Sequence, residues 1–116
     1  LLAAAFIQAS HGAYYAFASN IWIAQGIDGG HIGALWATGV AAEILLLLLS
    51  RRLFGGISPY TLLWLGGLGA FVRWSAAGLV LPVEYVYVLQ TLHAASFALT
   101  HLAVMRYLEE RLHMDQ

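Results

Sequence analysis

Four long apolar stretches make up almost the whole chain, and short segments rich in turn-forming residues separate them. The breaks fall at residues 26–30, at 51–58 and at Pro82. A bilayer core about 30 Å thick is crossed by about 20 residues of helix, and in lipid each backbone polar group must bond within its own segment. The sequence therefore predicts an all-α, polytopic membrane protein with four transmembrane helices. The expected spans are about 1–25, 31–50, 59–81 and 83–107, followed by a charged tail over 108–116.

Composition supports lipid as the solvent. The 116 residues are 61% hydrophobic and only 9% charged, whereas a soluble domain has about 25% charged residues. Five arginines and no lysine form no basic patch, which argues against a nucleic-acid partner. The absence of cysteine excludes disulfides and thiolate sites. The chain opens in an apolar run without Met, so we expect a fragment of a longer membrane protein.

The arginines predict an orientation. Arg51 and Arg52 lie in the second connection, and Arg106 and Arg111 lie at the end of the fourth span. Lys and Arg are enriched in cytoplasmic loops. Both ends of the chain are therefore expected on the cytoplasmic side.

Glu43 and Arg73 lie in the middle of the second and third apolar stretches. A charge at the bilayer centre costs about 2.5–3.5 kcal/mol on insertion scales, so such residues mark transport or proton-handling paths by default. In low dielectric Glu43 could alternate between a neutral protonated form and a charged form paired with Arg73. His93 titrates near physiological pH and could relay a proton between them.

Two polar stripes run along the first and fourth spans. Residues spaced by three or four lie on one helical face, and these stripes predict a polar interior. Their members are Gln8, His11, Tyr15, Ser19 and Trp22 in the first span, and Gln90, His93, Phe97 and His101 in the fourth.

The same residues give little support to an enzyme or a metal protein. His93 and His101 are eight residues apart, about 12 Å along a helix, which is too far for shared coordination. No HExxH, clustered carboxylate or nucleophile motif is present, so we expect no metal, no cofactor and no catalytic residues. A non-transporting four-helix membrane scaffold remains an alternative.

Six short motifs, in this order and spacing, resemble the 3-phenylpropionic acid transporters of the major facilitator superfamily. They are QASHGAYY at 8–15, GALW at 33–36, VAAE at 40–43, VRW at 72–74, LQTLH at 89–93 and HLAVMRY at 101–107. The resemblance implies that residues 1–116 form part of a C-terminal transmembrane domain, helices seven to ten of a twelve-helix fold. Its implied location is the inner membrane, and its implied partner is the missing N-terminal half.

More distantly, the chain resembles lactose permease-type proton symporters, whose coupling residues include Glu, Arg and His on helices eight, nine and ten. This implies proton coupling by Glu43, Arg73 and His93. Those permeases have a carboxylate three residues after that His, where this chain has Ser96. The proton carrier therefore stays open between Glu43, His93 and the missing half.

The expected function is proton-coupled symport of a small aromatic carboxylate such as 3-phenylpropionate. A sugar or nucleoside symporter of the same superfamily is the alternative. The expected substrate-binding residues are Arg73, His11, Tyr15, Gln90, Phe97 and His101.

Overall fold

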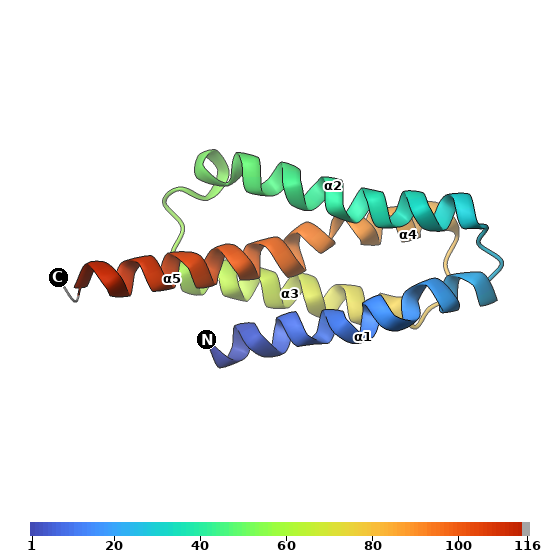
Figure 1. The fold of residues 1–116 in the computed structure, drawn as a ribbon, viewed down its shortest axis with the longest axis horizontal. Helices are drawn as coiled ribbons and strands as arrows, with labels where there is room; N and C mark the ends of the chain where they lie inside the picture. The colour runs from blue at the N-terminus through green and yellow to red at the C-terminus, as the bar shows by residue number, and fades with distance from the viewer. Residues whose placement is uncertain (115–116) are drawn as a thin grey trace.

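The computed structural model describes residues 1–114, which form an all-helical bundle without a strand in that range. Figure 1 shows α1 and α2 meeting at their connection and diverging along their length, with the rod of α4, η1 and α5 between them and α3 alongside. The elements in order are α1 (Leu2–Ala24), α2 (Gly29–Phe54), α3 (Pro59–Ala77), α4 (Val83–Thr91), η1 (Ala94–Leu99) and α5 (Thr100–Met114).

Side-chain caps fix where two helices begin. Asp28 Oδ1 accepts from the backbone N–H groups of Gly30 and His31 at 2.8 and 3.1 Å, so α2 begins at Gly29. Ser58 Oγ accepts from Thr61 N at 3.2 Å at the start of α3. Both are N-cap residues that satisfy amide groups left free in the first turn. The connections after α1, α2 and α3 are short, so α1, α2, α3 and the rod of α4, η1 and α5 run antiparallel in turn.

The fourth apolar stretch is not one regular α-helix. Residues 94–99 form a π-helical turn, η1, between α4 and α5. Single π turns inside α-helices are rare and frequently occur at functional sites. No Gly or Pro marks this turn, so the predicted single span over 83–107 did not anticipate it.

Two glycines of α3 pack directly against this π turn. A Cβ atom added to Gly66 would lie 2.3 Å from Thr100 Oγ1, and one added to Gly69 would lie 2.9 Å from Ala95 Cβ. Only glycine allows the two backbones to approach this closely. The contact fixes the position of α3, and with it Arg73, against η1.

The helix ends differ from the predicted spans by a few residues. Helix α2 continues to Phe54, through Arg51 and Arg52, and α3 ends at Ala77 rather than near Leu81. Helix α5 continues into the predicted tail as far as Met114. The last two residues of that tail lie outside the described range.

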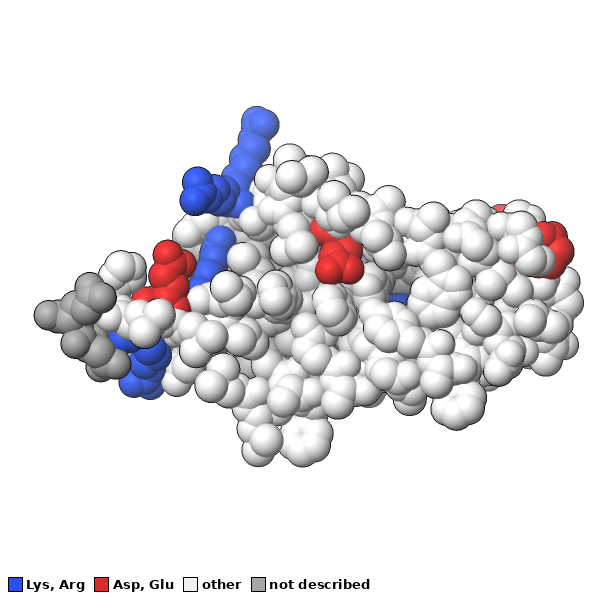
Figure 2. All heavy atoms as spheres, viewed as in Figure 1, with Lys and Arg blue, Asp and Glu red and all other residues white. Residues whose placement is uncertain are grey.

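Most of the visible surface is uncharged, and blue basic side chains gather at the end of the molecule where α5 terminates (Figure 2). Two of the described helical runs, Gly29–Phe54 and Val83–Met114, are long and apolar enough to cross a membrane by length and composition. Four spans therefore remain a prediction, as does the cytoplasmic side.

Candidate functional site

A buried hydrogen-bond network centres on Arg73 of α3, whose side chain is only 2% exposed. Its Nη1 lies 3.2 Å from His93 Nδ1 and donates to Ser96 Oγ at 2.9 Å. Its Nη2 donates to Gln90 Oε1 at 3.3 Å. Three of the five guanidinium N–H groups thus have partners among the described residues. One cation is held by side chains from both sides of the α4–η1 junction.

Glu43 of α2 joins this network through His93. Its Oε2 lies 3.1 Å from His93 Nε2. The Glu43 side chain is 22% exposed, so it borders open space while His93 is buried. The part of the chain that the structure describes contains no direct contact between Glu43 and Arg73. The three groups therefore contact one another in the order Glu43 carboxylate, His93 imidazole, Arg73 guanidinium.

The hydrogen bonds fix the proton position on His93. Arg73 can only donate, so His93 Nδ1 must accept. A neutral imidazole then has its single proton on Nε2, which donates to the Glu43 carboxylate. Tyr15 Oη lies 3.4 Å from the same Nε2. His93 therefore connects Arg73 to Glu43 as a neutral ring with a defined tautomer.

His11 of α1 has the opposite tautomer. Its Nδ1 lies 2.9 Å from the backbone carbonyl of Ile7, an acceptor, so Nδ1 has the proton. Its Nε2 lies 3.0 Å from Ser96 Oγ and, in the neutral ring, accepts from it. His11 is 1% exposed, and the rings of Trp74 and Phe97 lie 5.1 and 5.3 Å away between centroids.

Aromatic rings and an amide enclose the other side of the guanidinium. Arg73 Cζ lies 4.8 Å from the Tyr14 ring centroid and 4.9 Å from that of Trp74. Cation–π contacts of this kind stabilise a desolvated cation. Tyr14 Oη donates to Gln90 Oε1 at 2.9 Å, and Gln90 Nε2 donates to Leu35 O at 3.1 Å. Gln90 thereby links α1, α2 and α3.

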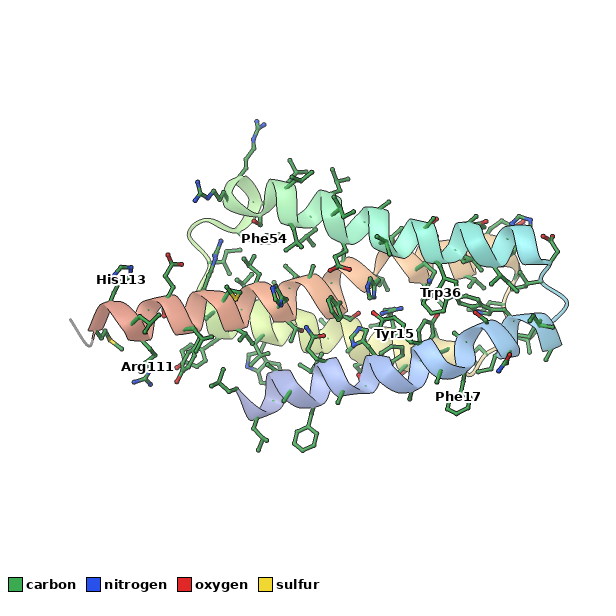
Figure 3. All side chains as sticks on the ribbon, in the orientation of Figure 1. Tyr15, Phe17, Trp36, Phe54, Arg111 and His113 are labelled. Atoms are coloured by element: carbon green, nitrogen blue, oxygen red, sulfur yellow. The ribbon has the colours of Figure 1, made fainter. Side chains whose placement is uncertain are left out.

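The network borders a cavity of about 350 Å³ that opens between α1 and α2. In Figure 3 Tyr15 of α1 and Trp36 of α2 lie in the space between these two helices, whereas Phe17 points away from the bundle. The two facing rings are 5.7 Å apart between centroids. The cavity is lined by Tyr15, Trp36, Gly39, Val40, Glu43, Arg73, Gln90 and His93.

Most of the predicted site residues meet here. Phe97 stacks on His93 at 5.2 Å between centroids. His101 differs, because it is exposed on α5 and makes no side-chain hydrogen bond within residues 1–114. The structure brings together Glu43, Arg73, His93, His11, Tyr15, Gln90 and Phe97, and their predicted roles in coupling and binding remain predictions.

Three further contributors were not among the predicted site residues, although Ser96 stood out in the sequence as a departure from the permease pattern. Ser96, Tyr14 and Trp74 contact Arg73 or its partners directly. Tyr14 and Trp74 flank predicted site residues in the chain and lie within the motifs at 8–15 and 72–74, which are the signals that could have pointed to them. Across residues 1–114 no group of three or more potential metal ligands comes together.

Sequence comparisons identify the family of this chain. The sequence model of the MFS_1 like family matches residues 1–115. The chain belongs to this family. The chain is similar in sequence to the probable 3-phenylpropionic acid transporter of Escherichia coli (strain K12), which is 36% identical over 105 residues, or 90% of this chain.

The chain spans only 28% of that relative's length. No solved structure matches this chain. As a member of the MFS_1 like family it is related to membrane transporters rather than to enzymes.

Proposed function

We propose that this chain forms part of the substrate path of a proton-coupled symporter for a small aromatic carboxylate. In this proposal its helices correspond to helices seven to ten of a twelve-helix transporter in the inner membrane. The C-terminal ends of α2 and α5 face the cytoplasm. The rest of the path comes from segments outside residues 1–116, because two repeats around a midplane site are needed for alternating access.

The observation that supports an anionic substrate is the incompletely paired Arg73. Two of its five N–H groups have no hydrogen-bond partner among the described residues, yet the side chain borders the cavity. A planar guanidinium binds a carboxylate through two parallel hydrogen bonds. The rings of Tyr15 and Trp36 line the same cavity and suit an aromatic group. The resemblance to a probable 3-phenylpropionic acid transporter points to the same ligand class.

Glu43 suits the role of proton carrier in this arrangement. It lines the same cavity as Arg73, so an ionised Glu43 and a substrate carboxylate would repel each other. Substrate binding therefore favours a protonated Glu43, and protonation favours substrate binding by the same factor. This reciprocal coupling is what symport requires.

His93 is less suited to take up a second proton in this state. Its Nδ1 faces an N–H of Arg73, so an imidazolium would bring two donors and two positive charges together. Protonation of His93 thus requires Arg73 to leave. We assign His93 the task of orienting Glu43 and transmitting its charge state to Arg73.

Uptake against a gradient tests this proposal. In proteoliposomes containing the full-length transporter, Glu43→Gln should lower by one the number of protons that cross with each 3-phenylpropionate in pH-driven accumulation, while exchange down its gradient continues. Glu84→Gln is the matched control, because Glu84 is exposed in the first turn of α4. An unchanged number of protons per substrate in the Glu43→Gln protein would show that Glu43 does not carry a proton.

A further inference from the structure

The Ser96 hydroxyl has one hydrogen and two acceptors within reach. Its oxygen accepts from Arg73 Nη1 at 2.9 Å. The hydrogen can point to His11 Nε2 at 3.0 Å or to the His93 backbone carbonyl at 3.4 Å. The hydroxyl hydrogen can turn about the Cβ–Oγ bond to point to either acceptor. Ser96 is fully buried, so water does not compete for either position.

We propose that His11 is a second proton-binding group of this site and that the Ser96 hydroxyl is the switch that admits its proton. The inference rests on the proposed symport function and adds a group to it. No covalent step is involved, because a proton moves to His11 Nε2 and the Ser96 hydrogen turns away.

The two hydrogen-bond states differ only at Ser96. In the neutral state Nδ1–H of His11 donates to Ile7 O, and Ser96 donates to Nε2. In the imidazolium state Nε2–H donates to Ser96 Oγ, whose hydrogen turns to the His93 carbonyl. Arg73 keeps its bond to Ser96 in both. His11 can therefore become charged without the rearrangement that His93 would require.

The charges around His11 determine when it is protonated. Arg73 of α3 faces it through Ser96, and His93 at the α4–η1 junction lies 5.6 Å away between ring centroids. Tyr15 is the titratable neighbour on its own helix, and Glu43 of α2 reaches it only through His93. A positive Arg73 disfavours a second cation nearby. A carboxylate bound to the unpaired N–H groups of Arg73 would offset that repulsion, so substrate and this proton should bind together.

This predicts a specific charge balance. With Glu43 as the only carrier, one proton and one carboxylate cross together and no net charge moves. With His11 as a second carrier, two protons cross with each carboxylate, and one positive charge moves inward per cycle. Uptake then responds to membrane potential as well as to the pH gradient.

Reversal-potential measurements on proteoliposomes with the full-length transporter and 3-phenylpropionate count this charge. We expect one net positive charge per substrate in the wild type and none in His11→Gln. Ser96→Ala retains the imidazole but leaves its Nε2–H without an acceptor, so it should also lose the charge. His31→Gln is the matched control, because His31 is exposed at the start of α2 and contacts Tyr87 rather than the network.

The outcomes separate the two proposals. Electroneutral, pH-driven uptake by the wild type would overturn the role of His11 and leave proton symport standing. A full charge per substrate in both His11→Gln and Ser96→Ala would overturn it as well. An uptake that does not depend on the pH gradient would refute the proposed function itself. The net charge moved per substrate can be measured on the wild type alone, so the proposal can be tested even if a variant does not fold.

Discussion

The contact between α3 and the π turn η1 makes Gly69, one helical turn before Arg73, a position where one added methyl group should disturb the site. A Cβ at Gly69 would lie 2.9 Å from Ala95 Cβ and 3.2 Å from Ser96 N. Both atoms belong to the packed turn and cannot swing aside as a flexible side-chain end would. Overpacking of this kind costs about 1–3 kcal/mol. Gly69→Ala should therefore destabilise the transporter although alanine is the better helix former.

Gly67→Ala supplies the matched control on the same helix. Its added Cβ would meet only Ile7 Cδ1, at an ordinary 3.5 Å. Both substitutions gain the same helix propensity, about 0.8–1.0 kcal/mol, so this gain cancels in the comparison. The expected difference in unfolding free energy between the two variants is then the overpacking cost, about 1–3 kcal/mol.

The substitution should also disturb the site. Gly69 lies one helical turn before Arg73, and the displaced atoms include the backbone of Ser96. A shift of a few tenths of an ångström would lengthen the 2.9 Å bond from Arg73 to Ser96. Thermal unfolding of the purified full-length variants measures stability, and 3-phenylpropionate binding measures the site. Equal stability of Gly69→Ala and Gly67→Ala would refute the reasoning.

Two further predictions concern the ends of the helices. Arg106 donates to the carbonyls of Phe54 and Ile57, so Arg106→Met should speed hydrogen exchange and proteolysis at 54–58, unlike Arg111→Met, whose guanidinium lies over Tyr107. The hydrogen bond from the His31 backbone lowers the pKa of Asp28. The cap should therefore persist above the ordinary Asp pKa and be lost as pH falls through the lowered value. Amide exchange at Gly30 and His31 measures this, and Asp28→Ser should remove the pH dependence without removing the cap.

The sequence predicted the parts of the site that depend on helical periodicity. His11 and Tyr15 share a stripe on α1, and Gln90 of α4 shares one with His93 at the α4–η1 junction, because spacing determines which residues lie on one helical face. Periodicity does not give depth along the axis. His101 continues the second stripe but lies about 12 Å further along the helix, estimated from the α-helical rise, where it is exposed.

The direct pairing expected of Glu43 and Arg73 was not found, because His93 lies between them. Sequence spacing gives no distance between side chains on different helices, so the sequence could suggest His93 as a link between the two charges but could not exclude a direct pair. The π turn had no sequence signal either. It is stabilised by contacts that α3 makes through Gly66 and Gly69, which are distant in the chain.

Ser96 shows why intramembrane hydroxyls are hard to interpret. Thr38 Oγ1 and Thr100 Oγ1 both bond to backbone carbonyls of their own helical segments at 2.8 Å, as such residues usually do. Ser96 differs because it faces Arg73 and His11 from two other helices. Only the tertiary arrangement distinguishes the three hydroxyls.

The serine at position 96 also bears on substrate class. The resemblance to lactose permease-type symporters implies a carboxylate at this place, three residues after His93. A carboxylate there would lie within reach of Arg73 Nη1, which now donates to Ser96 Oγ at 2.9 Å. A buried carboxylate so close would pair with the guanidinium and neutralise it. Serine satisfies one N–H without adding a negative charge, so Arg73 retains a net charge for an anion. By this reasoning the departure from the permease pattern favours an acid over a neutral sugar as the substrate.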